Sequence, residues 1–394
     1  SLYKSNCRIM PYYNHHIRSK LPKIGTTIFT TMSNLANDHG AINLSQGFPD
    51  FDVDERLKHL AIKYIKKGPH QYAPMQGALS LREAIYEKVN AMYNASYDVE
   101  KEITITAGAT QAIYTAISAI IKENDEVILF TPAYDCYEPA IEICGGKPVF
   151  IQLQAPDFAI NWEEVKKLIS SKTRMIIINS PHNPTGSVLT KRDFIALEKI
   201  ISDTGIIVLS DEVYEHLVYD DHTPQSVVSY PKLASSAIAV FSFGKTFHVT
   251  GWKLGYVLAP ENLMHEFRKV HQFNVFSCNH PFQLAIAEYI KDEENYLKLS
   301  AFYNKKRKLF LEMVNASRFK AVPSKGTYFQ LLNYEEISSL SDIEMAKKMT
   351  IENKLASIPI SVFYHAKIDQ KFLRFCFAKK DETLKKAGEI LTQL

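Results

Sequence analysis

Five short apolar runs between residues 100 and 245 constrain the fold of this chain most. Each has three to five residues, and they lie at 103–105, 127–130, 175–178, 206–209 and 237–241. Runs this short, without polar alternation, are typical of parallel strands that are buried on both faces. Helical patterns separate them. The sequence therefore predicts an α/β fold: a mostly parallel central sheet with helices on both faces.

The segment after the first run has the pattern of an amphipathic helix. Its apolar residues recur at spacings of three and four, which places them on one helix face. They are Ala109, Ala112, Ile113, Ala116, Ile117, Ile120 and Ile121. Gly108 stands immediately before them, so we expect the strand-to-helix turn at this glycine.

The C-terminal part of the chain has a different organisation. A charged helical pattern covers residues 288–313, an apolar run that predicts a strand covers 371–377, and a second helical pattern covers 383–394. We expect a smaller α+β domain onto which the N-terminal arm folds. The expected boundaries are 1–50 for the arm and part of the small domain, 51–285 for the large domain, and 286–394 for the C-terminal small domain.

Composition excludes several classes of partner. The 46 Lys and Arg residues nearly balance the 43 Asp and Glu residues, so neither nucleic acid nor an anionic membrane is an expected partner. The longest apolar stretches have about ten residues, half of what a membrane-spanning helix needs. The five cysteines form no CxxC pair or Cys/His cluster, which argues against disulfides and a metal site and favours the cytoplasm.

The first 37 residues carry five basic and no acidic side chains. This bias can be read as an organelle transit segment. Pro11 interrupts any long helix there, so an extended arm is the interpretation that we favour.

Polar residues, glycines and an aromatic residue follow the five apolar runs. They occupy residues 106–110, 131–134, 179–186, 210–214 and 242–245. Because the carboxyl ends of parallel strands meet at one edge of a sheet, and ligands bind at that edge, we expect a small-molecule site there.

Three positions at this edge suggest the chemistry. Free N–H groups at Gly108 and the two residues after it can hold a phosphate, although a tight turn alone also explains the glycine. Asp211 ends a buried run and needs a partner, or else caps the next segment. Lys245 either has such a role or extends to solvent. A ligand that needs a phosphate cradle, a carboxylate, a stacking aromatic and a lysine together is pyridoxal 5'-phosphate.

The glycine spacing matches neither GxxxxGK[ST] nor GxGxxG, so neither a nucleoside triphosphatase nor a dehydrogenase is expected.

Several linked motifs carry a family resemblance. The first group of motifs is SxxK at residues 242–245, then GWKLG after it, with HNPTG and SDEVY upstream. The likeness extends over nearly the whole chain through three more motifs: INLSQGFPDF, HQYAP and LRFCFAK. The chain resembles the fold-type I, class I aminotransferases that use pyridoxal 5'-phosphate. Within them it is most similar to the methionine/kynurenine (glutamine-phenylpyruvate) aminotransferase branch.

The resemblance implies a role for each matching residue around the cofactor. Lys245 forms a Schiff base with the cofactor aldehyde and moves the substrate proton, and Asp211 pairs with the pyridine nitrogen. The other implied cofactor contacts are Tyr134 on the ring face, Asn183 and Tyr214 at the ring hydroxyl, and Gly108, Ala109, Thr110, Ser242 and Lys253 at the phosphate. Lys253 stands where many relatives have arginine. Tyr72 reaches the phosphate of a neighbouring subunit's cofactor and completes the catalytic set with Lys245 and Asp211, which implies a homodimer with shared active sites.

The resemblance also implies a substrate site. Arg374 grips the substrate carboxylate through a bidentate pair, and Gly47 and Asn183 complete that part of the site. The implied aromatic pocket consists of Phe29, Tyr134, Phe276, Tyr328 and Phe363. Each of these aromatic residues is equally compatible with an ordinary place in the core.

The expected activity is ping-pong transamination. An amino group moves from a large apolar or aromatic amino acid, such as methionine, phenylalanine, tyrosine, glutamine or kynurenine, to a 2-oxo acid. The same residues support cysteine-S-conjugate β-lyase activity as an alternative. A third possibility, a cofactor-sensing regulatory domain, requires an added DNA-binding module, for which the segment before residue 45 is short.

Overall fold

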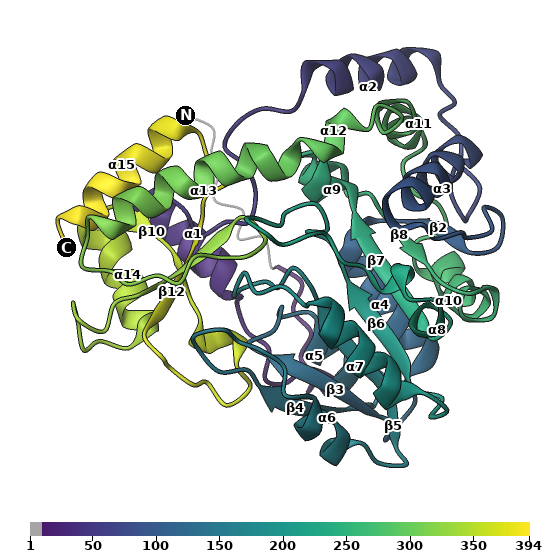
Figure 1. The fold of residues 1–394 in the computed structure, drawn as a ribbon, viewed down its shortest axis with the longest axis horizontal. Coiled ribbons are helices and arrows are strands. Elements are labelled where there is room, and N and C mark those ends of the chain that lie inside the picture. The colour runs from purple at the N-terminus through teal and green to yellow at the C-terminus, as the bar shows by residue number, and fades with distance from the viewer. Residues whose placement is uncertain (1–9) are drawn as a thin grey trace.

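The computed structural model describes residues 10–394; the beginning of the expected arm, with Cys7, lies outside the described residues. A seven-stranded sheet forms the centre of the larger part of the molecule (Figure 1). In spatial order its strands are β2 (Ile103–Thr106), β8 (Gly255–Leu258), β7 (Ala237–Ser242), β6 (Ile207–Asp211), β5 (Thr173–Asn179), β3 (Glu126–Thr131) and β4 (Lys147–Gln152). β8 runs antiparallel to both of its neighbours, β2 and β7, and the other adjacent pairs of this sheet are parallel. The predicted α/β class and mostly parallel sheet are confirmed.

The five predicted strands are present, and β4 and β8 were not anticipated. β4 is an edge strand that begins at the exposed Lys147 and contains Pro148, so its sequence lacks a continuous apolar run. Proline is tolerated there because an edge strand leaves some N–H groups unpaired. β8 is four residues long and begins at Gly255, inside a motif whose glycines and lysine suggest a loop.

Helices cover both faces of the sheet. Along β3, Val127 and Leu129 contribute to one buried cluster, and Ile128 and Phe130 contribute to the other. This alternation is the two-residue period of a strand whose two faces are both buried. On the first face lie α4 (Gly108–Ile120), α5 (Tyr137–Ile143) and α10 (Glu261–Asn274). On the second lie α3 (Leu79–Tyr93), α6 (Trp162–Leu168), α7 (Lys191–Ile201) and α8 (Pro231–Ala234).

A smaller group of elements packs beside the sheet. It contains α1 (Ile28–His39), β1 (Ile42–Asn43), α13 (Leu299–Asn315), β9 (Phe329–Asn333), α14 (Asp342–Glu352), β10 (Leu355–Ala356), β11 (Ile358–Pro359), β12 (Phe372–Cys376) and α15 (Asp381–Thr392). β9, β12 and β11 form an antiparallel sheet, and β1 pairs with β10. In Figure 1 the purple α1 lies among these green and yellow elements, so the N-terminal and C-terminal parts pack together.

The expected continuous helical pattern over 288–313 was wrong at residues 290–293. α11 (His280–Tyr289) ends before it, α12 (Glu294–Leu297) is one turn, and α13 follows. The Asp292 side chain accepts the N–H of Glu294 at 3.2 Å, a local bond that favours a turn before α12. α15 begins at Asp381, two residues before the predicted start. The remaining helices are α2 (Glu55–Lys67), α9 (Phe243–Thr246) and the 3₁₀ turns η1 (Val227–Ser229), η2 (Thr250–Trp252) and η3 (Ser361–Phe363).

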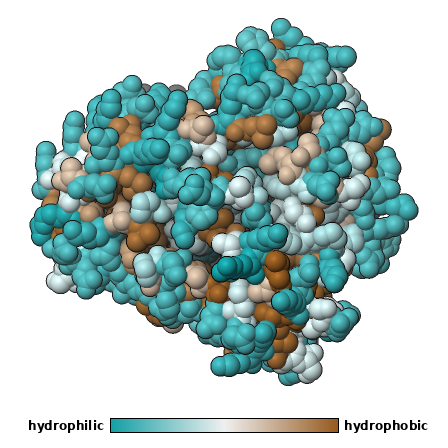
Figure 2. Space-filling view, viewed as in Figure 1, coloured by the Kyte–Doolittle hydropathy of each residue, from teal (hydrophilic) through white to brown (hydrophobic). Residues whose placement is uncertain are grey.

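The surface drawn in Figure 2 is mostly hydrophilic, and its hydrophobic residues are in small groups. Within residues 10–394, no helix has the length and apolar character that crossing a bilayer requires.

Candidate active site

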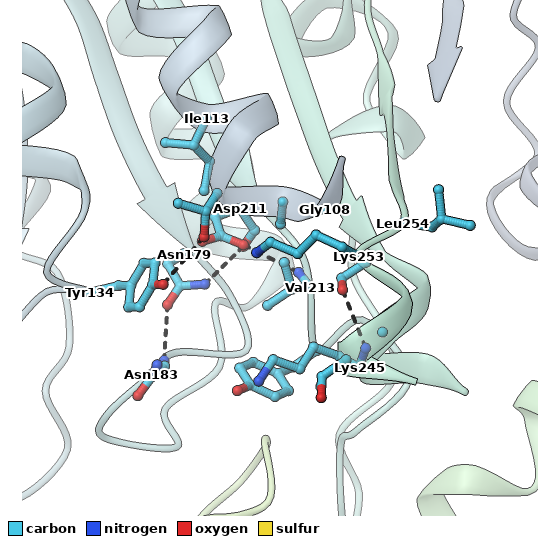
Figure 3. A pocket seen from close by; sticks show the side chains of 16 residues that line it. Gly108, Ile113, Tyr134, Asn179, Asn183, Asp211, Val213, Lys245, Lys253 and Leu254 are labelled. Carbon is cyan, nitrogen blue, oxygen red and sulfur yellow. Dashed lines mark hydrogen bonds between the residues drawn. The ribbon is translucent and has the colours of Figure 1, made fainter. Parts of the chain in front are cut away.

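One cavity of about 200 Å³ lies at the carboxyl ends of the parallel strands. The loops after β2, β3, β5, β6 and β7 all contribute to its wall, which is the edge at which the sequence predicted a ligand (Figure 3). Every residue expected to contact the cofactor lines this cavity except Tyr72. The lining includes Gly108, Ala109, Thr110, Tyr134, Asn183, Asp211, Tyr214, Ser242, Lys245 and Lys253.

Lys245 lies on α9, the short helix that follows β7. Ser242 caps this helix, and its Oγ accepts the Lys245 N–H at 3.2 Å. The Lys245 Nζ donates to the Gly47 carbonyl at 2.7 Å and lies 3.2 Å from the Tyr328 hydroxyl. Burial lowers the pKa of Lys245 to about 8, and the nearby positive charge of Arg374 acts in the same direction. At pH 7 about a tenth of the amine is then neutral, compared with less than about a thousandth for an ordinary lysine, and the neutral form is what a nucleophile or base requires.

Asp211 is the last residue of β6 and is buried. Its Oδ2 accepts the Tyr137 hydroxyl at 2.5 Å, and its Oδ1 accepts the Val213 N–H at 3.3 Å. The Asn179 side-chain amide donates to the Asp211 carbonyl at 2.9 Å, which joins β6 to the end of β5. Burial raises the pKa of Asp211 to about 6. A cationic ring nitrogen beside this carboxyl would favour its charged form.

The part of the cavity at the start of α4 is suited to an anion. α4 begins at Gly108, where φ is +77°, and a Cβ at this position would lie 3.2 Å from Cδ of Lys253 and 3.3 Å from its Nζ. The Lys253 side chain therefore passes directly over the N-terminus of α4. Nearby, the hydroxyls of Thr110 and Tyr134 lie 3.3 Å apart. Free N–H groups at a helix start, together with an ammonium group, bind phosphate.

These features fit pyridoxal 5'-phosphate. The helix start with Lys253 can take the phosphate, and Asp211 can take the ring nitrogen. Lys245 presents an amine to the same cavity, and Tyr134 supplies an aromatic side chain in its wall (Figure 3). Gly108 leaves room that a larger residue would fill with a side chain pressed against Lys253.

A second cavity of about 560 Å³ adjoins the first, and Tyr134, Asn183, Tyr214 and Lys245 line both. Phe29, Gly47 and Arg374, which the sequence assigned to the substrate, contribute to its wall. Aromatic Phe48 and Phe329 and the polar side chains of α1 complete the enclosure. Its lining is Phe29, Thr30, Ser33, Asn34, Asn37, Gln46, Gly47, Phe48, Tyr134, Asn183, Tyr214, Lys245, Thr250, Phe329 and Arg374.

Arg374 reaches this second cavity from β12 and is only 1% exposed. Its Nη1 donates to Asn183 Oδ1 and its Nη2 to the Ser45 carbonyl, both at 2.8 Å. Its Nε has no partner, and the guanidinium lies 3.9 Å from the centre of the Phe329 ring. Burial lowers the pKa of Arg374. A buried cation with an unpaired N–H beside a cavity is suited to a carboxylate ligand.

Four residues that the sequence assigned to the site line neither cavity: Tyr72, Phe276, Tyr328 and Phe363. Tyr72 is 79% exposed, and its ring contacts that of Phe276 at 5.1 Å between centres. Phe363 is buried and packs against Phe29, a residue of the second cavity, at 5.7 Å between ring centres. Tyr328 is fully buried and touches Lys245 instead.

Sequence reasoning missed four residues that the structure places in or beside the site. Asn179 ends β5, so the strand-end rule that found Asp211 could also have found it. Tyr137 starts α5, close after Tyr134, but nothing in the sequence indicates its bond to Asp211. Ser45 and Phe329 contact Arg374 only through tertiary packing, for which the sequence gives no local signal.

Comparisons with known proteins agree with this geometry. The family described as aminotransferase class I and II matches residues 39–391. Methionine aminotransferase of Escherichia coli (strain K12) is 48% identical over 378 residues, which cover 96% of this chain and 98% of that protein. Kynurenine–oxoglutarate transaminase 3 of Homo sapiens is 32% identical over 406 residues, covering 94% and 88%.

A solved structure gives the same result. YbdL from Escherichia coli, described with a methionine aminotransferase function, has a TM-score of 0.94 at 46% identity, and the match covers 96% of this chain and 100% of that one. The resemblance to the methionine/kynurenine branch is thus confirmed. Matches over almost the whole length show that the chain belongs to the class I and II aminotransferases, enzymes that move amino groups with pyridoxal 5'-phosphate.

Proposed function

We propose that this aminotransferase takes its amino group from a large apolar or aromatic amino acid, with methionine the first candidate, and passes it to a 2-oxo acid. The observation that carries the proposal is the pair of adjoining cavities, with Lys245 between them. The first has the groups for the cofactor. The second places Arg374 and several aromatic rings within reach of the same lysine.

Each residue around the first cavity has a proposed task. Bound pyridoxal 5'-phosphate supplies a reactive aldehyde and a ring that accepts electrons from the substrate Cα. The Asp211 carboxylate would keep the ring nitrogen protonated, and the Lys245 amine would bind the cofactor through its aldehyde and serve as the base for the proton on the substrate Cα. Lys253 and the start of α4 hold the phosphate, assisted by Ala109, Thr110 and Ser242. Tyr134 would stack on the ring, and Asn183 and Tyr214 would donate to its hydroxyl oxygen.

In the second cavity, we expect Arg374→Lys to raise the KM for the amino acid by about 10- to 100-fold, because a lysine cannot form the bidentate pair with the α-carboxylate. The effect on kcat should be smaller. Steady-state kinetics with methionine measures both. Arg307→Lys is a matched control, since Arg307 is equally buried but pairs with Asp220 at 2.7 Å. Equal KM values for the Arg374→Lys variant and the wild type would remove Arg374 from the substrate site.

The second cavity also predicts substrate preference. Phe29, Phe48 and Phe329 contribute apolar surface, and Arg374 is assigned to the α-carboxylate, so a second carboxylate on the substrate would be poorly neutralised. We expect kcat/KM for methionine and phenylalanine to exceed that for aspartate by at least about tenfold, a difference of about 1.4 kcal/mol. A panel of amino donors against one fixed oxo acid measures this. A tenfold preference for aspartate would overturn the substrate proposal.

We also propose a homodimer in which Tyr72 of each chain reaches the partner's cofactor phosphate. In support, Tyr72 and Phe276 form an exposed aromatic pair, and Phe273 nearby in sequence is 87% exposed. Aromatic residues are enriched at protein interfaces. Analytical ultracentrifugation tests the proposal, and a single-chain mass at micromolar concentration would contradict it.

A cytoplasmic location and the division of the chain at residues 51 and 286 are also proposals. The four described cysteines are free, as in a reducing compartment. The pairing of β1 with β10 supports the assignment of the N-terminal segment to the small domain.

A further inference from the structure

Tyr328 occupies a place that its assignment to the substrate pocket does not explain. It directly precedes β9 and is fully buried, and it lines neither of the two cavities. Its hydroxyl donates to the Gly47 carbonyl and lies 3.2 Å from the Lys245 Nζ. The same carbonyl accepts from the Lys245 Nζ at 2.7 Å. Amine, hydroxyl and carbonyl therefore form a closed triangle of polar groups.

The hydrogens in this triangle can be assigned. A tyrosine hydroxyl has one hydrogen, and here Gly47 takes it, so the Tyr328 oxygen can only accept from Lys245. The Gly47 carbonyl is also an acceptor only. A neutral lysine amine has two N–H groups and one lone pair. Both N–H groups are engaged by these two oxygens, so the lone pair points away from them.

Gly47 lines only the second cavity, so a lone pair directed away from the Gly47 and Tyr328 oxygens faces the first cavity, which is the one suited to the cofactor. Lys245 lines both, whereas Tyr328 lines neither. A Cβ at Gly47 would lie 3.1 Å from the Phe329 ring, which is a tight contact, and 3.6 Å from the Lys245 Nζ, which is an ordinary one. A larger residue at position 47 would therefore press on Phe329, whose backbone adjoins Tyr328.

We propose that Tyr328 is a positioning residue for the reaction: with the Gly47 carbonyl, its hydroxyl holds the free Lys245 amine so that the lone pair faces the substrate Cα. The inference rests on the proposed role of Lys245. The proposed role of Tyr328 applies to the steps in which the Lys245 amine is not bonded to the cofactor and can move a proton. Proton transfer depends on such alignment.

Aromatic rings pack closely around Tyr328. Its ring contacts those of Tyr214 at 5.1 Å, Phe329 at 5.0 Å and Tyr303 at 5.6 Å between centres. These contacts fix the position of the hydroxyl independently of Lys245. Other charged or titratable groups that act on Lys245 are Asp211, Lys253, Arg374 and Cys376. None of them is altered when the Tyr328 hydroxyl is removed.

The test compares Tyr328→Phe with Tyr303→Phe. Tyr303 belongs to the same aromatic cluster, but its hydroxyl bonds His248 Nε2 at 2.7 Å and not Lys245, so the control removes a buried hydroxyl without touching the amine. In the holoenzyme, Tyr328→Phe should lower kcat by about tenfold, because misalignment slows proton transfer. KM should change less than about twofold, since Tyr328 does not line the substrate cavity.

A second measurement does not depend on activity. Acetic anhydride labels Lys245 in the full chain freed of cofactor, and mass spectrometry follows the labelled fraction against pH. The Tyr328 oxygen stabilises the ammonium form as an acceptor, so its loss should lower the labelling midpoint by about one pH unit. Tyr303→Phe should leave the midpoint, kcat and KM unchanged.

Two results would overturn the proposed role of Tyr328 and leave the proposed function intact. The first is a raised KM at unchanged kcat in Tyr328→Phe, which indicates a substrate contact. The second is an equal effect of Tyr328→Phe and Tyr303→Phe on kcat and on the labelling midpoint, which indicates a packing role. A wild-type protein that binds no pyridoxal 5'-phosphate at Lys245 would instead overturn the proposed function. Borohydride treatment of the wild type followed by mass spectrometry shows whether the cofactor is bonded to Lys245, and this measurement comes before any variant is compared.

Discussion

Lys245→Ala should lower turnover by about 10⁴-fold or more, because it removes the only group assigned both to attack the cofactor aldehyde and to move the proton. Cofactor should still bind without a covalent bond. Asp211, Lys253 and the start of α4 remain in the variant, and they hold the ring nitrogen and phosphate. Single-turnover absorbance with excess methionine measures the rate, and equilibrium dialysis measures binding.

Lys253→Ala is the matched control because its amine enters the same cavity. It should weaken cofactor binding, since the phosphate loses a cation, but retain turnover once the cofactor is saturating. Transamination by Lys245→Ala at near wild-type rate would refute the assigned base. The reverse pattern, with Lys253 essential and Lys245 dispensable, would exchange their roles.

Asp211→Asn should abolish most activity and yet stabilise the cofactor-free protein. Burial raises the pKa of Asp211 from 3.8 to about 6, so the folded chain binds this proton more tightly than the unfolded chain. Stability is therefore lost as the pH rises from about 4 through 6. Above that window the buried charge costs about 3 kcal/mol, the equivalent of the pKa difference. Asparagine removes that cost, and we expect a gain of about 2 kcal/mol at pH 7.

Urea unfolding at pH 4 and at pH 7 measures this effect, which should be present only at pH 7. Turnover should fall at least about 100-fold, because the neutral amide no longer keeps the ring nitrogen protonated. Glu212→Gln is the control: burial raises the pKa of Glu212 to about 8, so its carboxyl already carries a proton at pH 7, and it does not line the cavity. A destabilised Asp211→Asn protein with normal turnover would contradict the assignment.

The parts of the site that could be predicted are those that the sheet itself brings together. Asp211 is the last residue of β6, and Lys245 lies three residues after the end of β7, so the parallel order of the two strands places both residues at one edge of the sheet. Gly108 is found by the same rule, at the start of α4. The motif resemblance added the chemical roles that strand position alone leaves open.

Contacts between distant segments could not be predicted. Gly47 and Lys245 are 198 residues apart, and Asn183 and Arg374 are 191 apart, yet each pair forms a hydrogen bond. Such contacts depend on how the smaller group of elements packs against the sheet. Local sequence also could not show that Tyr328 approaches the lysine, because an aromatic residue near a strand is equally suited to core or pocket.

The central claim is that Lys245 is the residue that bonds the cofactor. The direct measurement is borohydride reduction of the wild-type holoenzyme, followed by proteolysis and mass spectrometry of the lysine peptides. The account predicts one stoichiometric pyridoxyl phosphate group, on Lys245. A group on Lys253 or any other lysine, or none at all on a protein that transaminates, would contradict it.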